Sequence, residues 1–144
     1  MASTHVAHDC LVGDNVIMSN LATLGGHVKI GNYAIIGGGV LVHQFTRIGE
    51  HSLIGGGFRV VQDVPPFIIA ANHPLRYKGV NIVGLKRRGF LKKDTDLIKK
   101  AYREFFRSGG NRKTAVEKIE SEFSKTKVIQ KIIDFIKHSN RGII

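Results

Sequence analysis

The chain has 144 residues, of which 42% are hydrophobic, and a formal net charge of +11. This length suits one domain with at most an appended subdomain, and no apolar run approaches the ~18 residues of a membrane-spanning helix. The single cysteine excludes an internal disulfide framework, and the N-terminus has neither the charged start nor the apolar core of a signal peptide. We therefore expect a cytoplasmic protein.

The charge is unevenly distributed along the chain. Residues 1–64 contain three Lys and Arg against four acidic residues, whereas residues 65–144 contain nineteen against seven. A basic half beside a near-neutral half predicts an anionic partner, which composition leaves open as nucleic acid, anionic lipid or an acidic protein. Nucleic acid is the least favoured, because no aromatic platform accompanies the basic residues.

Residues 6–64 repeat with a period of six. The second position of each hexad is mostly glycine, the fifth is mostly small or β-branched, and the first is always aliphatic. The first-position residues are Val6, Val12, Met18, Leu24, Ile30, Ile36, Val42, Ile48, Ile54 and Val60. Neither a helix nor a flat strand has this period, so the pattern predicts a parallel β-helix with three hexads per turn.

The first, fourth and seventh hexads should stack on one face, because successive turns are ~4.8 Å apart. These hexads contain His8, His27 and His43, which we expect within about 10–12 Å of one another. A single histidine is usually a solvated surface residue, but three on one face of a coil built from glycine and aliphatic residues favour a functional site.

Two kinds of chemistry could use these histidines. A metal site is one, but the three histidines differ in hexad position, and Asp9 and Asp14 do not look arranged as ligands. We therefore expect no metal ion and favour a general base, His8, whose ring Asp9 would orient. His51 falls on another face and is expected to have no catalytic role.

Residues 65–92 form a predicted connecting loop and basic cluster. Pro65 and Pro66 are expected to end the β-helix, since proline cannot donate to a ladder. A short apolar strand, a loop around residues 72–74 and a second extended piece should follow. The basic run at residues 86–88 suits phosphate binding or is a solvated linker.

Residues 93–144 are predicted to form a helical domain. A first helix, capped by Asp94 or Thr95, should run to about residue 108 and end at Gly109–Gly110. Further helices are predicted over about 113–124 and 127–138, followed by a frayed or docked tail. Their aromatic stripes are interpreted as core.

Several short motifs in this chain resemble one known family. They are AHDC at 7–10, GGHV at 25–28, VHQF at 42–45, QDVPPF at 62–67, VNIVGLKRRGF at 80–90 and Arg141–Gly142. Together they resemble the UDP-N-acetylglucosamine O-acyltransferases that begin lipid A synthesis, over essentially the whole chain. The resemblance implies a homotrimer of left-handed parallel β-helices, each followed by a C-terminal α-helical subdomain. The corresponding divisions of this chain are 1–64, 65–92 and 93–144.

The resemblance also implies an activity without a cofactor. The family moves an (R)-3-hydroxyacyl chain from acyl carrier protein to the 3-hydroxyl of UDP-N-acetylglucosamine. By motif, His8 resembles the general base, Asp9 its orienting partner, and Gly26 the backbone N–H donor to the oxyanion. The positions that resemble substrate-lining residues are His5, His27, His43 and Gln44. Positions that resemble contacts to the nucleotide or acyl donor are Asn81, Arg87 and Arg88, and Gly56 resembles the position that limits acyl length. Acyl carrier proteins are acidic, which would suit the basic half of this chain.

The chain departs from the family pattern at several places. Val83 stands where some members carry an acid, residues 73–78 differ, and members are roughly twice as long, with further coils on the N-terminal side. One alternative is therefore a truncated, inactive trimeric scaffold or carrier-protein-binding fragment. Another is the sister N-acyltransferase, which the LKRRGF motif argues against.

Overall fold

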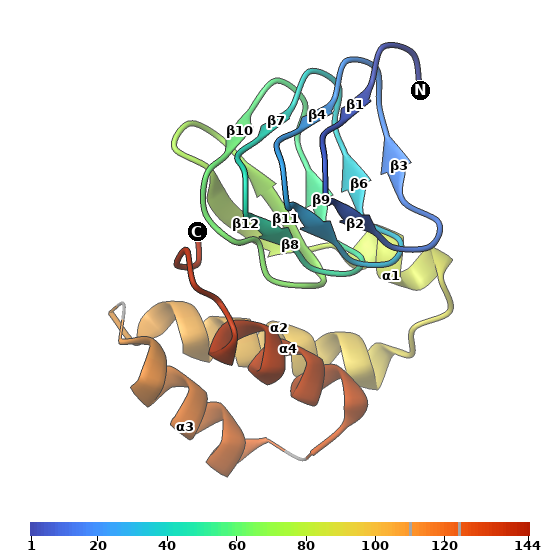
Figure 1. Ribbon diagram of the computed structural model, residues 1–144. Coiled ribbons are helices and arrows are strands. Elements are labelled where there is room, and N and C mark those ends of the chain that lie inside the picture. The colour runs from blue at the N-terminus through green and yellow to red at the C-terminus, as the bar shows by residue number, and fades with distance from the viewer. Residues whose placement is uncertain (110, 124) are drawn as a thin grey trace. The chain divides into compact units, whose positions relative to one another are not determined.

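The computed structural model describes residues 1–109, 111–123 and 125–144. The chain forms two compact units, one made of Met1–Asn81 with Ser139–Ile144 and the other of Ile82–His138 (Figure 1). Among the described residues, none of the helices combines the length and apolar character needed to cross a membrane.

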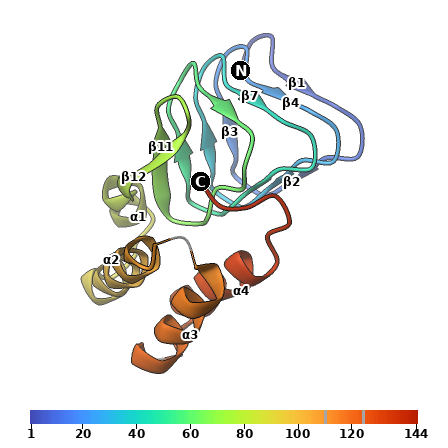
Figure 2. The same ribbon diagram turned by 90° about the vertical axis from the view of Figure 1, so that its left-hand side faces the viewer.

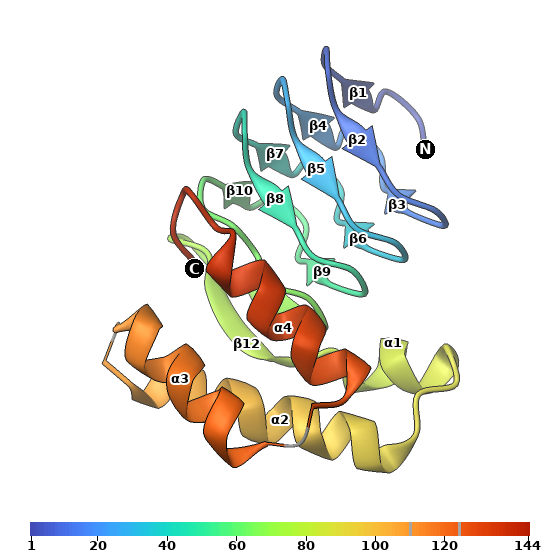
Figure 3. The same ribbon diagram turned by 60° about the horizontal axis from the view of Figure 1, so that its bottom comes forward.

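The first unit is a parallel β-solenoid made of two-residue strands. These are β1 (His5–Val6), β2 (Leu11–Val12), β3 (Ile17–Met18), β4 (Thr23–Leu24), β5 (Lys29–Ile30), β6 (Ile35–Ile36), β7 (Leu41–Val42), β8 (Arg47–Ile48), β9 (Leu53–Ile54) and β10 (Arg59–Val60). Each strand pairs in parallel with the third strand before or after it, giving the ladders β1-β4-β7-β10, β2-β5-β8 and β3-β6-β9 (Figure 3). The parallel β-helix predicted from the hexads is confirmed.

The register of the coil is 18 residues. His5 pairs with Thr23, and Thr23 pairs with Leu41, so the first, fourth and seventh hexads are stacked as expected. Residues at the same hexad position, 18 apart, are therefore neighbours in successive coils.

A corner follows each strand at the fourth position of the hexad. Every such residue from Ser3 to Gly57 has a positive φ, including Asp9 (60°), His27 (60°) and Phe45 (63°). This left-handed conformation disfavours most side chains, but aspartate and histidine are enriched there. It makes the chain turn sharply between sheets, and it places Asp9, His27 and Phe45 at one corner of three successive coils.

The solenoid interior is filled by the residues at the first and fifth hexad positions. Leu24, Ile36 and Ile54 are fully buried, as are the smaller Ala22 and Ala34. In the first coil the equivalent positions are more open: Val6 is 48% exposed, whereas Leu24, one coil further on, is 0% exposed.

The ladders continue past the two prolines, contrary to the predicted exit there. Val64 bridges Ile48, and β11 (Ile68–Ala71) pairs in parallel with β9, while β12 (Arg76–Val80) returns antiparallel to β11. Pro65 and Pro66 occupy a corner, where no ladder donor is needed, so they do not interrupt the pairing. The predicted loop at 72–74 lies between β11 and β12.

The C-terminal residues of the chain dock on the solenoid through Asp63. Of the two alternatives expected for this tail, frayed or docked, the structure shows the docked one. Asp63 is 1% exposed, and its carboxyl accepts hydrogen bonds from the backbone N–H of Arg47 (2.8 Å) and the hydroxyl of Ser139 (2.6 Å). Ile143 forms a parallel bridge to Asp63, and Arg141 Nε donates to the carbonyl of Val61 at 3.2 Å. Figure 2 shows this segment beside the last coil.

The second unit is helical. It contains α1 (Ile82–Arg87), α2 (Lys92–Arg107), α3 (Arg112–Glu122) and α4 (Lys127–Lys137), with α2 contacting the other three. The three long helices were expected, and their apolar faces form a core around Ile98, Tyr102 and Ile132. The short α1 was not, because a six-residue helix beside a basic run leaves little periodicity to detect.

The predicted cap of the first long helix is wrong. α2 begins at Lys92 after the N-cap residue Leu91, which makes no side-chain cap. The hydroxyl of Thr95 instead donates back to the carbonyl of Leu91 at 3.3 Å. Gly110 and Ser124, which were expected to end the first two long helices, lie outside the described residues.

Candidate functional site

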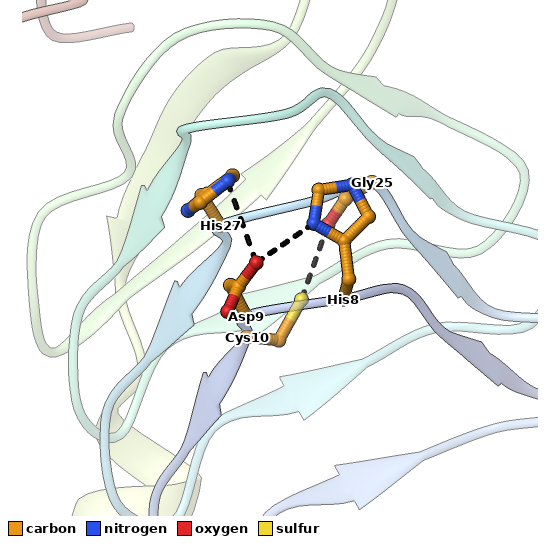
Figure 4. Close-up of polar contacts among 5 residues, drawn as sticks. All are labelled: His8, Asp9, Cys10, Gly25 and His27. Carbon is orange, nitrogen blue, oxygen red and sulfur yellow. Dashed lines mark hydrogen bonds and ion pairs between the residues drawn. The ribbon is translucent and has the colours of Figure 1, made fainter.

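His8 and Asp9 lie at the corner between β1 and β2. His8 Nδ1 is 2.9 Å from Asp9 Oδ2, and their side chains are 73% and 66% exposed (Figure 4). An ionised carboxylate only accepts hydrogen bonds, so the proton of this bond belongs to Nδ1. In a neutral imidazole this tautomer leaves the lone pair on Nε2, where it can accept a proton.

His8 lies over a space left by Gly26, the residue at the same hexad position one coil further on. A Cβ atom on Gly26 would lie 2.7 Å from His8 Cε1 and 2.8 Å from Nε2. These distances are shorter than any ordinary Cβ contact, so the absent side chain at position 26 is what allows the ring its present place.

The backbone N–H of Gly26 is available to a ligand. Gly26 is buried, yet within the described ranges its N–H has no acceptor in hydrogen-bonding reach. At two other corners an asparagine one coil further on supplies the acceptor: Asn20 Oδ1 accepts from the N–H of Ala2 at 3.2 Å and Asn32 Oδ1 from the N–H of Asp14 at 2.8 Å. The residue one coil after Gly26 is Gln44, which makes no such bond. Because buried N–H groups rarely lack a partner, this one is suited to an incoming oxygen.

His27 and Phe45 complete the corner. The two rings are stacked with centroids 4.6 Å apart and planes 7° apart, and the His8 ring meets His27 edge-on at 5.1 Å. His27 Nε2 lies 3.7 Å from Asp9 Oδ2, so Asp9 faces both histidines. Cys10 donates its thiol hydrogen to the carbonyl of Gly25 at 3.1 Å, which gives it a structural role beside the site (Figure 4).

The geometry changes one expectation about metal ligands. Ligand atoms of His8, Asp9 and His27 all lie within 4.8 Å of one another. The inference that Asp9 is not arranged as a ligand is therefore wrong. Asp9 shares the fourth hexad position with His27, and the 18-residue register brings the two corners together.

Two neighbours hold the pKa of the Asp9 carboxyl below its ordinary value of 3.8. The hydrogen bond from His8 is the largest cause, and the nearby charge of protonated His27 is the second. Because the pKa is lowered, the contribution of this interaction to stability is fully present at pH values above the ordinary pKa of the carboxyl. It is lost as the pH falls through the lowered pKa. We expect a carbon-13 NMR titration of Asp9 to have its midpoint below 3.8, and His8→Ala to raise that midpoint. An unchanged midpoint in the variant would show that the bond to His8 is not the main cause.

Adding a side chain at Gly26 should displace His8 without unfolding the coil. We expect Gly26→Ala to lower any His8-dependent activity by about 100-fold, because a displacement of ~1 Å can have this effect. Gly38→Ala is the matched control, because Gly38 has the same hexad position and a Cβ there would lie 3.4 Å from the nearest atom, the carbonyl oxygen of Asn20. The same loss in both variants, measured with unfolding curves, would contradict this account.

The remaining candidates lie at several places. His5 is in β1, and His43 and Gln44 follow β7 on the same face, where His43 Nδ1 is 3.1 Å from the carbonyl oxygen of Gln44. Gly56 is exposed at the corner after β9. Asn81 is 6% exposed and donates its amide to the carbonyl of His51 at 3.0 Å, so this side chain also braces the solenoid.

Arg87 ends α1 and Arg88 follows it, both exposed, in the second unit. His51, for which no catalytic role was expected, is 8% exposed and stacks on Tyr33 at 4.9 Å. Phe45 was not singled out from the sequence, although its position 18 residues after His27 was the signal that could have found it.

Comparison with known proteins identifies the family of this chain. The family described as "Udp N-acetylglucosamine O-acyltransferase; Domain 2" matches residues 63–144. The chain belongs to the UDP-N-acetylglucosamine O-acyltransferase family. The resemblance drawn from the sequence motifs is thereby confirmed.

Relatives in this family are similar along the whole chain. An acyl-[acyl-carrier-protein]–UDP-N-acetylglucosamine O-acyltransferase from Aliivibrio salmonicida is 48% identical over 99% of this chain and 54% of its own length. One from Nautilia profundicola is 45% identical over 99% of this chain and 55% of its own. The chain thus spans about half the length of the curated relatives that it matches.

Solved structures in this family have the same fold. The UDP-N-acetylglucosamine acyltransferase from Bacteroides fragilis superposes with a TM-score of 0.96 at 44% identity, covering 99% of this chain and 56% of that one. The Acinetobacter baumannii enzyme gives 0.93 at 39% identity, covering 98% and 55%.

Proposed function

We propose that this chain transfers an (R)-3-hydroxyacyl group from acyl carrier protein to the 3-hydroxyl of UDP-N-acetylglucosamine, the first step of lipid A biosynthesis. The observation that carries the proposal is the corner of His8, Asp9 and Gly26, where a proton acceptor and an unused backbone donor lie side by side. The proposed substrates are those of the related acyl-[acyl-carrier-protein]–UDP-N-acetylglucosamine O-acyltransferases.

The general base in this reaction is His8. Its Nε2 removes the proton from the sugar 3-hydroxyl while that oxygen attacks the thioester carbonyl, and Asp9 stabilises the resulting imidazolium through Nδ1–H. The Gly26 N–H donates to the negative oxygen of the tetrahedral intermediate. When the intermediate collapses, the C–S bond breaks and the imidazolium returns its proton to the departing thiolate. No covalent bond to the enzyme forms.

Other residues would hold the substrates. The residues that would line the substrate site are His5, His27, His43 and Gln44. Those that would contact the nucleotide or the acyl donor are Asn81, Arg87 and Arg88. Arginine suits this last role because its planar guanidinium forks onto phosphate oxygens. The acyl carrier protein is acidic, and the +12 charge of residues 65–144 would accelerate its encounter with the chain. We further propose a homotrimer in the cytoplasm.

Acyl length is assigned to Gly56. It shares the third hexad position with His8, so a side chain there would point outward from its corner, and a Cβ atom would meet only the backbone of Gly38, at 3.3 Å. We expect Gly56→Met to shift the preference toward shorter acyl chains by at least about tenfold in relative kcat/KM, since several buried methylenes would lose their space. Competition between donors of different length would measure this. An unaltered length preference would remove Gly56 from this role.

One observation favours a second function. The net charge of +12 on residues 65–144 also suits a scaffold or fragment that binds acidic carrier protein without turnover. The sister N-acyltransferase reaction is the other alternative.

Product analysis distinguishes these functions. The chain is incubated with 3-hydroxyacyl carrier protein and, separately, with UDP-N-acetylglucosamine or an amino-sugar analogue bearing a 3-amino group. The proposal predicts an ester at the 3-hydroxyl. An amide product as the faster one would support the N-acyltransferase, and carrier-protein binding without any product would support the scaffold.

A further inference from the structure

The corner that holds His8, Asp9 and His27 also has the composition of a metal site. Two imidazoles and one carboxylate are a common ligand set for zinc in proteins, where a water or substrate occupies the fourth position. The three ligand atoms lie within 4.8 Å of one another.

Two of the three distances between ligand atoms lie near those of a tetrahedral ion. Bonds of ~2.0–2.1 Å place neighbouring ligand atoms of a tetrahedral zinc site about 3.3 Å apart. Here His8 Nδ1 is 2.9 Å and His27 Nε2 is 3.7 Å from the shared Asp9 Oδ2, one slightly short of that value and one slightly beyond it. Small rotations of two side chains would therefore give the bound geometry.

Two features hold the ligands in place. The His8 ring lies in the space above Gly26, and the His27 ring is stacked on Phe45 with planes only 7° apart. Side chains held by packing lose less freedom when they bind an ion. The group is also open to solvent, since the His8 and Asp9 side chains are 73% and 66% exposed.

We propose that His8, Asp9 and His27 bind one Zn²⁺ ion, or a similar borderline divalent transition-metal ion, reversibly, and that the bound ion inhibits acyl transfer. The binding itself follows from the geometry, whereas the inhibition rests on the proposed function.

Inhibition follows from the two nitrogens of one ring. When Nδ1 of His8 coordinates the ion, its hydrogen can no longer be there, and the neutral ring carries that proton on Nε2. Nε2 is the atom that must accept the proton of the sugar hydroxyl. The ion also replaces the hydrogen bond between Asp9 and the His8 ring. Metal binding and general-base catalysis therefore require different tautomers of His8, and the two cannot occur together.

Calorimetric titration of the full chain with Zn²⁺ tests the binding, and Co²⁺ absorption reports its geometry. Asp9→Asn and His27→Asn remove a ligand while keeping a residue that tolerates the positive φ of these corners. His73→Gln and His138→Gln are controls, because both histidines are exposed and lie elsewhere. Circular dichroism of every variant establishes that it is folded.

The expected result is one Zn²⁺ per chain with low-micromolar affinity, weakened at least about tenfold by Asp9→Asn and by His27→Asn and unchanged in the controls. Absence of binding in this range would overturn the proposal, as would equal weakening in the controls. In the same preparation, Zn²⁺ should slow acyl transfer over the concentration range in which it binds, and a chelator should restore it. If the chain is active and binds Zn²⁺ but its rate of acyl transfer does not fall, the proposed inhibition is wrong. If the chain binds Zn²⁺ but transfers no acyl group, the proposed function is refuted and the metal site remains.

Discussion

His8→Ala is expected to lower kcat for acyl transfer by about 10²–10⁴-fold, the range that a positioned general base contributes. The free energy of unfolding should change by less than about 0.5 kcal/mol, since the side chain is 73% exposed and fills no core space. Steady-state kinetics and denaturant unfolding of both proteins measure the two effects.

The matched control for this substitution is His138→Ala, which removes an exposed histidine at the end of α4 whose Nδ1 lies 2.7 Å from the carbonyl oxygen of Asp134. Its kcat should be unchanged. Equal activity of His8→Ala and the wild-type chain would exclude His8 as the base.

Asp63→Ala should have the largest effect on stability. It would remove the acceptor of the part-buried N–H of Arg47 and of the buried hydroxyl of Ser139. Loss of a hydrogen-bond partner costs roughly 1–3 kcal/mol at such a group, so we expect a loss of about 2–4 kcal/mol. Asp63→Asn keeps one acceptor oxygen and should cost less. Denaturant unfolding gives the difference, and amide exchange of residues 139–144 should accelerate in the alanine variant.

Asp14→Ala is the control for Asp63→Ala, because Asp14 is exposed and its backbone, not its carboxyl, makes the observed bonds. It should change the unfolding free energy by less than about 0.5 kcal/mol. If both aspartate variants are equally stable, the docking of the C-terminal residues does not depend on Asp63.

The hexad period predicted the coil because one physical rule, a register of 18 residues, follows from three hexads per turn. The same rule explains the site: His8 and Gly26 share the third position, and Asp9, His27 and Phe45 share the fourth. The three histidines do not share one hexad position, so their spacing alone does not reveal the site. Asp9 and His27 differ in residue type but share the fourth position, and this shared position is what brings them together.

Other features depend on contacts that no local pattern contains. The bond between Ser139 and Asp63 joins residues 76 apart, and the tail could not be distinguished as frayed or docked without it. The prolines were misinterpreted because the rule against proline in a ladder does not apply at a corner. The predicted helix cap is wrong because the Thr95 hydroxyl donates to the carbonyl of the N-cap residue Leu91 rather than accepting from the first N–H groups of α2.

The most direct test of the account is turnover by this 144-residue chain, measured beside a full-length relative with the same carrier-protein donor and UDP-N-acetylglucosamine. The account predicts acyl transfer to the 3-hydroxyl at a rate comparable with that of the relative, lost in His8→Ala. A folded chain that binds the acyl carrier protein but transfers no acyl group would contradict it.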